Sequence, residues 1–218
     1  MPRAEITIPL AGVSLGGELN LPPGAVGLVL FAHGSGSSRQ SPRNQHVART
    51  LQEAGLGTLL FDLMTVEEEQ AEALTRHLRF NIPFLAERLA GATRWALGQA
   101  TTREMNAGFF GSSTGAAAAL VAAAELGQTI RAVVSRGGRP DLASDALDRV
   151  TAPTLLIVGG DDSPVIQLNE EAYSRLQCER ALRIVPGASH LFEEQGALEA
   201  VAKMAAEWFA NHLQPMVY

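Results

Sequence analysis

A short segment between two apolar runs carries the residue pattern of a catalytic serine. It reads Gly111-Ser112-Ser113-Thr114-Gly115, after Phe109-Phe110 and before an alanine-rich stretch. In the spacing Gly-x-Ser-x-Gly, the serine is held in a sharp bend between a strand and a helix, and the glycines permit close backbone approach. An ordinary strand-to-helix loop is the alternative interpretation. The spacing makes Ser113 a candidate nucleophile.

A serine hydroxyl needs a base, and the base needs an orienting acid. His190 follows the last apolar run of the chain, and Asp161 and Asp162 follow the run before it. The order serine, acid, histidine along the chain is the one expected when these residues follow successive strands of one sheet. The residues alone leave both aspartates open as the acid.

A second loop carries candidate groups for stabilising negative charge. The run Phe31-Ala32 is followed by His33-Gly34-Ser35-Gly36. Such a loop can supply one backbone N–H of an oxyanion hole, while the residue after the nucleophile supplies the other. We assign these donors to the amides of Ser35 and Thr114. His33 is a candidate substrate contact, although bracing the loop is the role that we favour.

Arginines in the loops around these segments suggest an anionic ligand. Guanidinium groups pair well with carboxylate and phosphate. The alternative is that they bond to loop carbonyls and to nearby acids such as Asp62 and Asp141, and we favour it for the group as a whole. Arg43 and Arg136 are retained as candidate substrate contacts. The four arginines are Arg39, Arg43, Arg136 and Arg139.

The elements that must position these residues alternate along the chain. Continuous apolar runs indicate strands buried on both faces, and the segments between them have helical periodicity. Thr65 and Glu68 have the spacing of a capping box, which predicts a helix start there. Strands are expected at 5–9, 13–21, 26–32, 56–61, 106–110, 130–135, 154–158 and 182–185, and helices at 42–54, from 65, and at 83–97, 114–126, 164–177 and 197–212.

An antiparallel start followed by strand–helix alternation predicts an α/β fold. We expect a mostly parallel eight-stranded sheet with helices on both faces, in one domain covering residues 1–218. Ligands then bind where strands end. Few residues separate Ser135 from Thr154, so no substantial cap domain is expected and small or accessible acyl groups are favoured. His46, His77 and His212 fall in predicted helices and are expected to have no role in the site.

Composition narrows the classes of partner. The 218 residues are 46% hydrophobic and 18% charged, with a net charge of −6, which argues against nucleic-acid binding driven by general charge. Cys178 is the only cysteine, so no intramolecular disulfide can form. From the sequence we expect neither a signal peptide nor a membrane span. We expect a cytoplasmic monomer or homodimer with no metal and no cofactor.

These segments together resemble the α/β-hydrolases of the dienelactone hydrolase-like group. The resemblance covers nearly the whole chain and implies that Asp162, rather than Asp161, is the acid. A bacterial hydrolase domain that is sometimes fused to a phosphoribosyltransferase also resembles this chain, and we expect the free-standing form here. The resemblance is carried by HGSGSSRQSPRN, LLFDLMTVEEE, RFNIPFLAERL and SRGGRPDLA. The founding dienelactone hydrolases have a cysteine nucleophile where this chain has Ser113, so the group's name does not imply dienelactone as substrate.

Two interpretations of different kinds follow. The first is a serine hydrolase that cleaves small or accessible carboxylic esters through an acyl-enzyme, with thioesters or peptides as further substrates of the same chemistry. The second is a non-catalytic ligand-binding protein on a hydrolase scaffold. A phosphate-binding or transferase protein would depend on the loop at residues 34–38, which lacks the GxxxxGK[ST] pattern.

Overall fold

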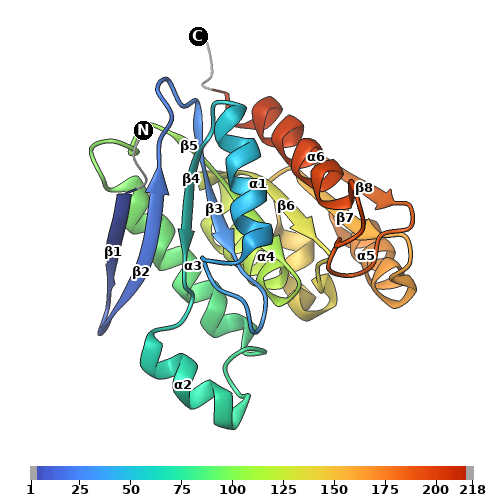
Figure 1. The fold of residues 1–218 in the computed structure, drawn as a ribbon, viewed down its shortest axis with the longest axis horizontal. Coiled ribbons are helices and arrows are strands. Elements are labelled where there is room, and N and C mark those ends of the chain that lie inside the picture. The colour runs from blue at the N-terminus through green and yellow to red at the C-terminus, as the bar shows by residue number, and fades with distance from the viewer. Residues whose placement is uncertain (1–3, 215–218) are drawn as a thin grey trace.

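A computed structural model describes residues 4–214 and shows one eight-stranded sheet flanked by helices (Figure 1). The strands are β1 (Ala4–Leu10), β2 (Val13–Asn20), β3 (Gly27–Ala32), β4 (Gly57–Phe61), β5 (Asn106–Ser112), β6 (Ile130–Arg136), β7 (Thr154–Gly159) and β8 (Arg180–Val185). The α-helices are α1 (Pro42–Glu53), α2 (Val66–Thr75), α3 (Ile82–Leu97), α4 (Thr114–Leu126), α5 (Ser163–Arg175) and α6 (Ala197–His212), with 3₁₀ helices η1 (Gly127–Thr129) and η2 (Pro140–Arg149).

The sheet has the strand order β1-β2-β4-β3-β5-β6-β7-β8. β1 and β2 are antiparallel, β2 is antiparallel to β4, and the remaining neighbours are parallel. The expected mostly parallel eight-stranded sheet is therefore confirmed. Because β3 to β8 all run the same way, the loops after them gather at one edge of the sheet.

Helices cover both faces of the sheet. α1 and α6 pack together on one face, and α3, α4 and α5 lie on the other (Figure 1). β3 shows how the sequence builds both layers. Val29 and Phe31 belong to the core beneath α1 and α6, whereas Leu28 and Leu30 belong to the core beneath α3 and α4. Alternate side chains of a buried strand point to opposite faces, which is why this run is apolar throughout.

The segment between β6 and β7 is short, as expected. It forms η2, which contains a break at Ser144 (φ 43°), and no cap domain stands there. Among the described residues, no helix is long and apolar enough to cross a membrane.

α2 projects from the body of the molecule after β4 (Figure 1). The predicted capping box is confirmed: the Thr65 hydroxyl accepts from the Glu68 amide, and the Glu68 carboxylate accepts from the Thr65 amide. The placement of His77 in a helix was wrong. α2 ends at Thr75, and Arg76 adopts a left-handed conformation (φ 52°), so His77 lies in the connection to α3.

Candidate active site

Ser113 lies in a strained bend between β5 and α4. It is the residue before the first helical position of α4, and its backbone angles are φ 51° and ψ −121°. A side chain other than glycine in this region costs about 1–3 kcal/mol, which the surrounding structure must offset. The bend presents the Ser113 side chain at the edge where the parallel strands end.

Two glycines let this bend form against the first turn of α4 and against the end of β3. A Cβ on Gly111 would lie 2.5 Å from the Cα of Ala116, inside the first turn of α4. A Cβ on Gly115 would collide with the backbone carbonyls of Ala32 and His33 at the end of β3. Since only glycine avoids both contacts, the Gly-x-Ser-x-Gly spacing has a steric cause here.

The histidine and one of the two aspartates form a hydrogen-bonded pair. His190, in the loop after β8, has its Nδ1 2.7 Å from Oδ2 of Asp162, the residue before the first helical position of α5. An ionised carboxylate can only accept, so Nδ1 carries the proton and Nε2 of a neutral His190 carries the free lone pair. Of the two candidate acids, Asp162 is therefore the one bonded to His190. The contact that the structure shows for Asp161 is made by its backbone amide, which donates to the carbonyl of Ala188.

The end of β6 joins the serine bend to the histidine loop. The Ser113 amide donates to the carbonyl of Arg136 at 3.3 Å. A Cβ on the next residue, Gly137 (φ 51°), would lie 3.5 Å from Cε1 of the His190 ring. Two consecutive residues therefore contact the two loops, which brings Ser113, Asp162 and His190 to the same edge of the sheet.

The Ser35 amide, one of the two predicted oxyanion donors, already has a partner. It donates to Oγ1 of Thr114 at 3.0 Å, and the Ser35 and Thr114 hydroxyls are 2.9 Å apart. The loop lies against the serine bend, because a Cβ on Gly34 would be 3.1 Å from the Cβ of Ser113. The Ser35 amide becomes available to a ligand only when the Thr114 hydroxyl turns aside or shares it.

Both ring nitrogens of His33 are bonded to backbone groups. Its ring is buried, with Nδ1 3.0 Å from the carbonyl of Gly34 and Nε2 accepting from the amide of Leu63 at 3.0 Å. Because both ring nitrogens have backbone partners, the geometry favours the bracing role, and His33 also lines a narrow crevice that it shares with Ser35 and Thr114. Its bonds connect the ends of β3 and β4.

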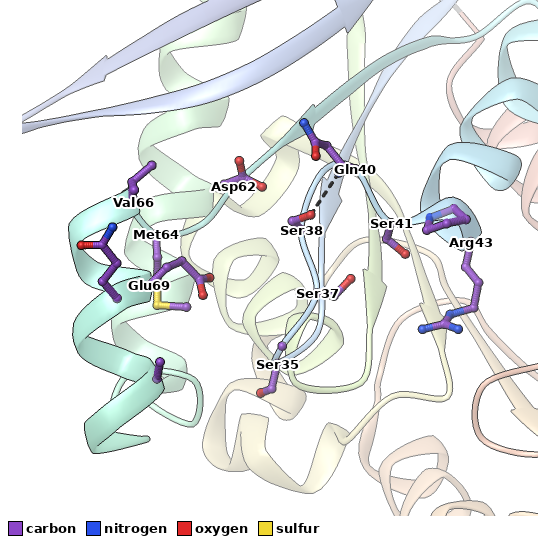
Figure 2. A pocket seen from close by; sticks show the side chains of 14 residues that line it. Ser35, Ser37, Ser38, Gln40, Ser41, Arg43, Asp62, Met64, Val66 and Glu69 are labelled. Carbon is purple, nitrogen blue, oxygen red and sulfur yellow. Dashed lines mark hydrogen bonds between the residues drawn. The ribbon is translucent and has the colours of Figure 1, made fainter.

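A cavity of about 790 Å³ adjoins the serine bend. One wall is the serine-rich loop from Ser35 to Arg43, and the facing wall includes Met64 and Glu69 (Figure 2). Neither Ser113 nor His190 lines it. Ser35 links the cavity to the serine bend, because it lines the cavity and also lines the narrow crevice together with Thr114. The sequence did not indicate that α2 would supply part of a pocket wall.

Three of the four loop arginines are paired as the alternative interpretation expected. Arg39 pairs with Asp62, and Arg139 makes two bonds to Asp141 at 2.7 and 2.8 Å. Arg43, which also lines the cavity, donates from Nη1 to Glu193 at 2.9 Å. Arg136 differs from the other three. It is 7% exposed, and no hydrogen bond or ion pair to its side chain occurs within residues 4–214.

The remaining reactive groups are not gathered into a site. Within residues 4–214, no group of three histidine, cysteine, aspartate or glutamate side chains is placed to hold a metal ion. Cys178 is half-buried before β8, and burial raises the pKa of its thiol.

This combination of sheet, serine bend and histidine–aspartate pair is that of an α/β-hydrolase. The chain belongs to the α/β-hydrolase domain family, whose model matches residues 25–216. It is 58% identical to a dienelactone hydrolase from Anabaena variabilis, whose crystal structure superposes with a TM-score of 0.96 over 98% of this chain and 99% of that one. The fold is also similar to that of Est1E from Butyrivibrio proteoclasticus, at 18% identity and a TM-score of 0.75 over 94% of this chain and 99% of that one.

Two curated relatives, both from Mycobacterium tuberculosis, are 53% identical over 209 residues and carry the name "Putative phosphoribosyl transferase". The match takes in 96% of this chain and 46% of each relative, so the chain spans about half their length. This similarity and the family match agree with both parts of the resemblance drawn from the sequence.

Proposed function

We propose that the protein is a serine hydrolase that cleaves carboxylic esters of small or accessible substrates. The observation that carries the proposal is the 2.7 Å bond between His190 and Asp162 at the same sheet edge as the strained Ser113. A strained serine beside an oriented imidazole is the arrangement that activates a hydroxyl for attack on a carbonyl.

In this mechanism Ser113 Oγ attacks the ester carbonyl while His190 Nε2 takes its proton. His190 then gives that proton to the departing alcohol, which leaves an acyl group on Ser113. Water attacks the acyl-enzyme with His190 again as base, the carboxylic acid departs, and Ser113 regains its proton. Asp162 holds the imidazole in the tautomer that each step requires and stabilises the imidazolium.

The developing oxyanion needs donors, and two amides lie beside the bend. The Thr114 amide belongs to the first turn of α4, where backbone N–H groups have no partner within the helix. The Ser35 amide would join it once the Thr114 hydroxyl, 3.0 Å away, gives way to the oxyanion. The adjoining cavity offers room for one side of the ester.

A transferase activity is not proposed for this chain. The transferase name belongs to proteins of which this chain covers 46%, so more than half of their length lies outside the match. Residues 25–216, by contrast, match the hydrolase family itself.

A lone cysteine is compatible with the cytoplasmic location that we propose.

The test is steady-state hydrolysis of short-chain p-nitrophenyl esters by the wild type, Ser113→Ala and Ser112→Ala. Loss of the nucleophile should lower kcat by about 10⁶-fold, because a triad without its serine retains only binding and oxyanion stabilisation. Ser112→Ala, a change at the neighbouring buried hydroxyl, is the matched control and should remain active. A folded wild type that neither turns over esters nor reacts with a fluorophosphonate would leave the non-catalytic binding scaffold as the better account.

A further inference from the structure

Arg136 is a buried cation for which the described residues supply no counter-charge. Its Nε and Nη1 atoms are buried and have no hydrogen-bond partner among the described residues. Buried charges in proteins are normally paired, because an unpaired one loses its hydration without compensation. Nη2 is not among these buried atoms, and no hydrogen bond to it occurs within residues 4–214, so it is the part of the guanidinium that a ligand can reach.

The position of Arg136 places this charge beside the candidate active site. It is the last residue of β6, and its carbonyl accepts from the Ser113 amide. Side chains two residues apart on a strand share a face, so Arg136 lies on the face of Ala132 and Val134, which pack beneath α1 and α6. The arginine therefore lies on the α1 and α6 side of the edge that holds Ser113.

A second cation, Arg43, lies on the same side of the sheet edge. Arg43 and Phe192 line one surface hollow, and a Cβ on Gly137, the residue after Arg136, would lie 3.4 Å from the Phe192 ring. Burial, and then the charge of Arg43 in the first turn of α1, lower the pKa of Arg136 to about 10. Arg136 thus stays protonated at neutral pH. Two neighbouring guanidinium groups repel each other, and the buried one, Arg136, has no acid partner within residues 4–214. An anion between them would stabilise both.

The acid bonded to Arg43 can be displaced. Glu193, three residues after His190, takes a single bond from Nη1 of Arg43, and its side chain is 63% exposed. An ion pair this exposed contributes little stability. Nε of Arg43 has no partner either. An incoming carboxylate or phosphate could replace Glu193 on Arg43 while also satisfying Arg136.

We propose that Arg136 and Arg43 form an anion subsite next to Ser113, which binds a carboxylate or phosphate group of the ester substrate. The inference rests on the proposed function, because it names the substrate class of that same site. Arg43 also lines the 790 Å³ cavity beside the serine-rich loop, and Figure 2 shows its side chain at the α1 end of that loop. A substrate held by the arginines can therefore extend into the cavity.

Two kinds of measurement test the subsite. The first compares kcat/KM for mono-p-nitrophenyl succinate and for p-nitrophenyl butyrate, which have acyl chains of the same length and differ in the terminal carboxylate. We expect the wild type to prefer the succinate and Arg136→Met to lower that preference by about 10–100-fold, the loss expected when one charge-assisted contact disappears. Arg139→Gln, at a loop arginine already paired with Asp141, is the matched control and should keep the preference.

The second measurement needs no turnover. Thermal unfolding at constant ionic strength is followed with inorganic phosphate, with succinate and with chloride as probes. Phosphate or succinate should raise the melting temperature of the wild type above its value in chloride, and Arg136→Met should abolish that rise. The anion with the larger effect identifies the group. Glu193→Gln should strengthen the response several-fold, because it removes the competing carboxylate.

The outcomes separate the subsite from the hydrolase proposal. Equal kcat/KM for the two esters, together with no response to phosphate or succinate, would overturn the subsite even if fluorophosphonate labels Ser113. A melting-temperature response that Arg136→Met abolishes would support it even if no ester is turned over. A response that survives Arg136→Met would also overturn it.

Discussion

Glu72 and Arg136 are both buried charged side chains, but only Glu72 has its charge satisfied. Glu72, on α2, is 1% exposed and accepts from the amides of Leu78 and Arg79 at 2.6 and 3.2 Å. Its carboxylate also accepts from Nε of Arg79 at 2.7 Å. Arg136, at 7% exposed, has no such partner. The two side chains are buried to a similar extent, but only the Glu72 side chain has hydrogen-bond partners among the described residues.

The difference separates a structural charge from one available to a ligand. Glu72 holds the segment after α2 in place through its hydrogen bonds to Leu78 and Arg79. In that segment the carbonyl of Arg79 accepts from the Ser35 hydroxyl at 3.0 Å. Glu72 thus helps to hold the loop that carries a candidate oxyanion donor. The Arg136 side chain makes no hydrogen bond or ion pair within residues 4–214, so the burial of its charge is not compensated there. Substitutions at Glu72 and Arg136 test this distinction, and a substitution at Asp162 tests the candidate active site beside them.

The largest effect is expected at the acid that orients the histidine. Asp162→Asn should lower kcat for a p-nitrophenyl ester by about 10⁴-fold, because an amide no longer selects the tautomer with a free Nε2. The melting temperature should change little, since the asparagine fills the same space. Asp161→Asn is the matched control, because the Asp161 contact shown by the structure is made by its backbone amide. Full activity in Asp162→Asn with loss in Asp161→Asn would reverse the assignment.

A smaller effect, on stability rather than chemistry, is expected at Glu72. Burial raises the pKa of Glu72, but bonds from Arg79 and Leu78 outweigh it and hold that pKa below its usual range. A carboxylate with a lowered folded-state pKa stabilises the protein above its unfolded pKa, and that stability is lost as the pH falls through the folded value. Glu72→Gln should therefore lower the melting temperature at pH 7. The difference in melting temperature between this variant and the wild type should become smaller as the pH falls.

The control for this prediction is Glu69→Gln, a change on the same helix at a cavity-lining side chain for which no ion pair occurs in the described part of the chain. Circular dichroism melts from pH 7 down to pH 3 would measure both variants. A Glu72→Gln variant with an unchanged melting temperature at pH 7 would contradict the structural role given to this carboxylate.

Most of the fold could be predicted from the sequence because local signals and tertiary packing agree. The runs at β3 and β7 are apolar on both faces, and α4 begins and ends at the expected residues, Thr114 and Leu126. The grouping of Ser113, Asp162 and His190 could be predicted for the same reason. Each residue follows a strand, and parallel strands end at the same edge of the sheet.

The errors and omissions concern residues whose surroundings are set by distant parts of the chain. α2 ends at Thr75, before the left-handed residue Arg76, although no glycine or proline marks this end in the sequence. The end is set by Glu72, which accepts from the amides of Leu78 and Arg79. His77 was therefore placed in a helix. The missing partner of Arg136 could not be predicted either, since it depends on which acids reach it, and Glu193 pairs with Arg43 instead.

The smallest effect should have the opposite sign from that at Glu72. Arg136→Met keeps a long apolar stem but removes a buried charge that lacks a partner, so the ligand-free protein should become more stable. A gain of about 1 kcal/mol would raise the melting temperature by about 2–4 °C in a chain of this size. The measurement is thermal unfolding in chloride buffer at pH 7, well below the pKa of about 10 at which Arg136 would lose its charge. Arg139→Met should instead lower the melting temperature slightly, because it leaves Asp141 without its two bonds. If Arg136→Met were destabilised as strongly as Glu72→Gln, the two buried charges would have the same structural role and the contrast between them would fail.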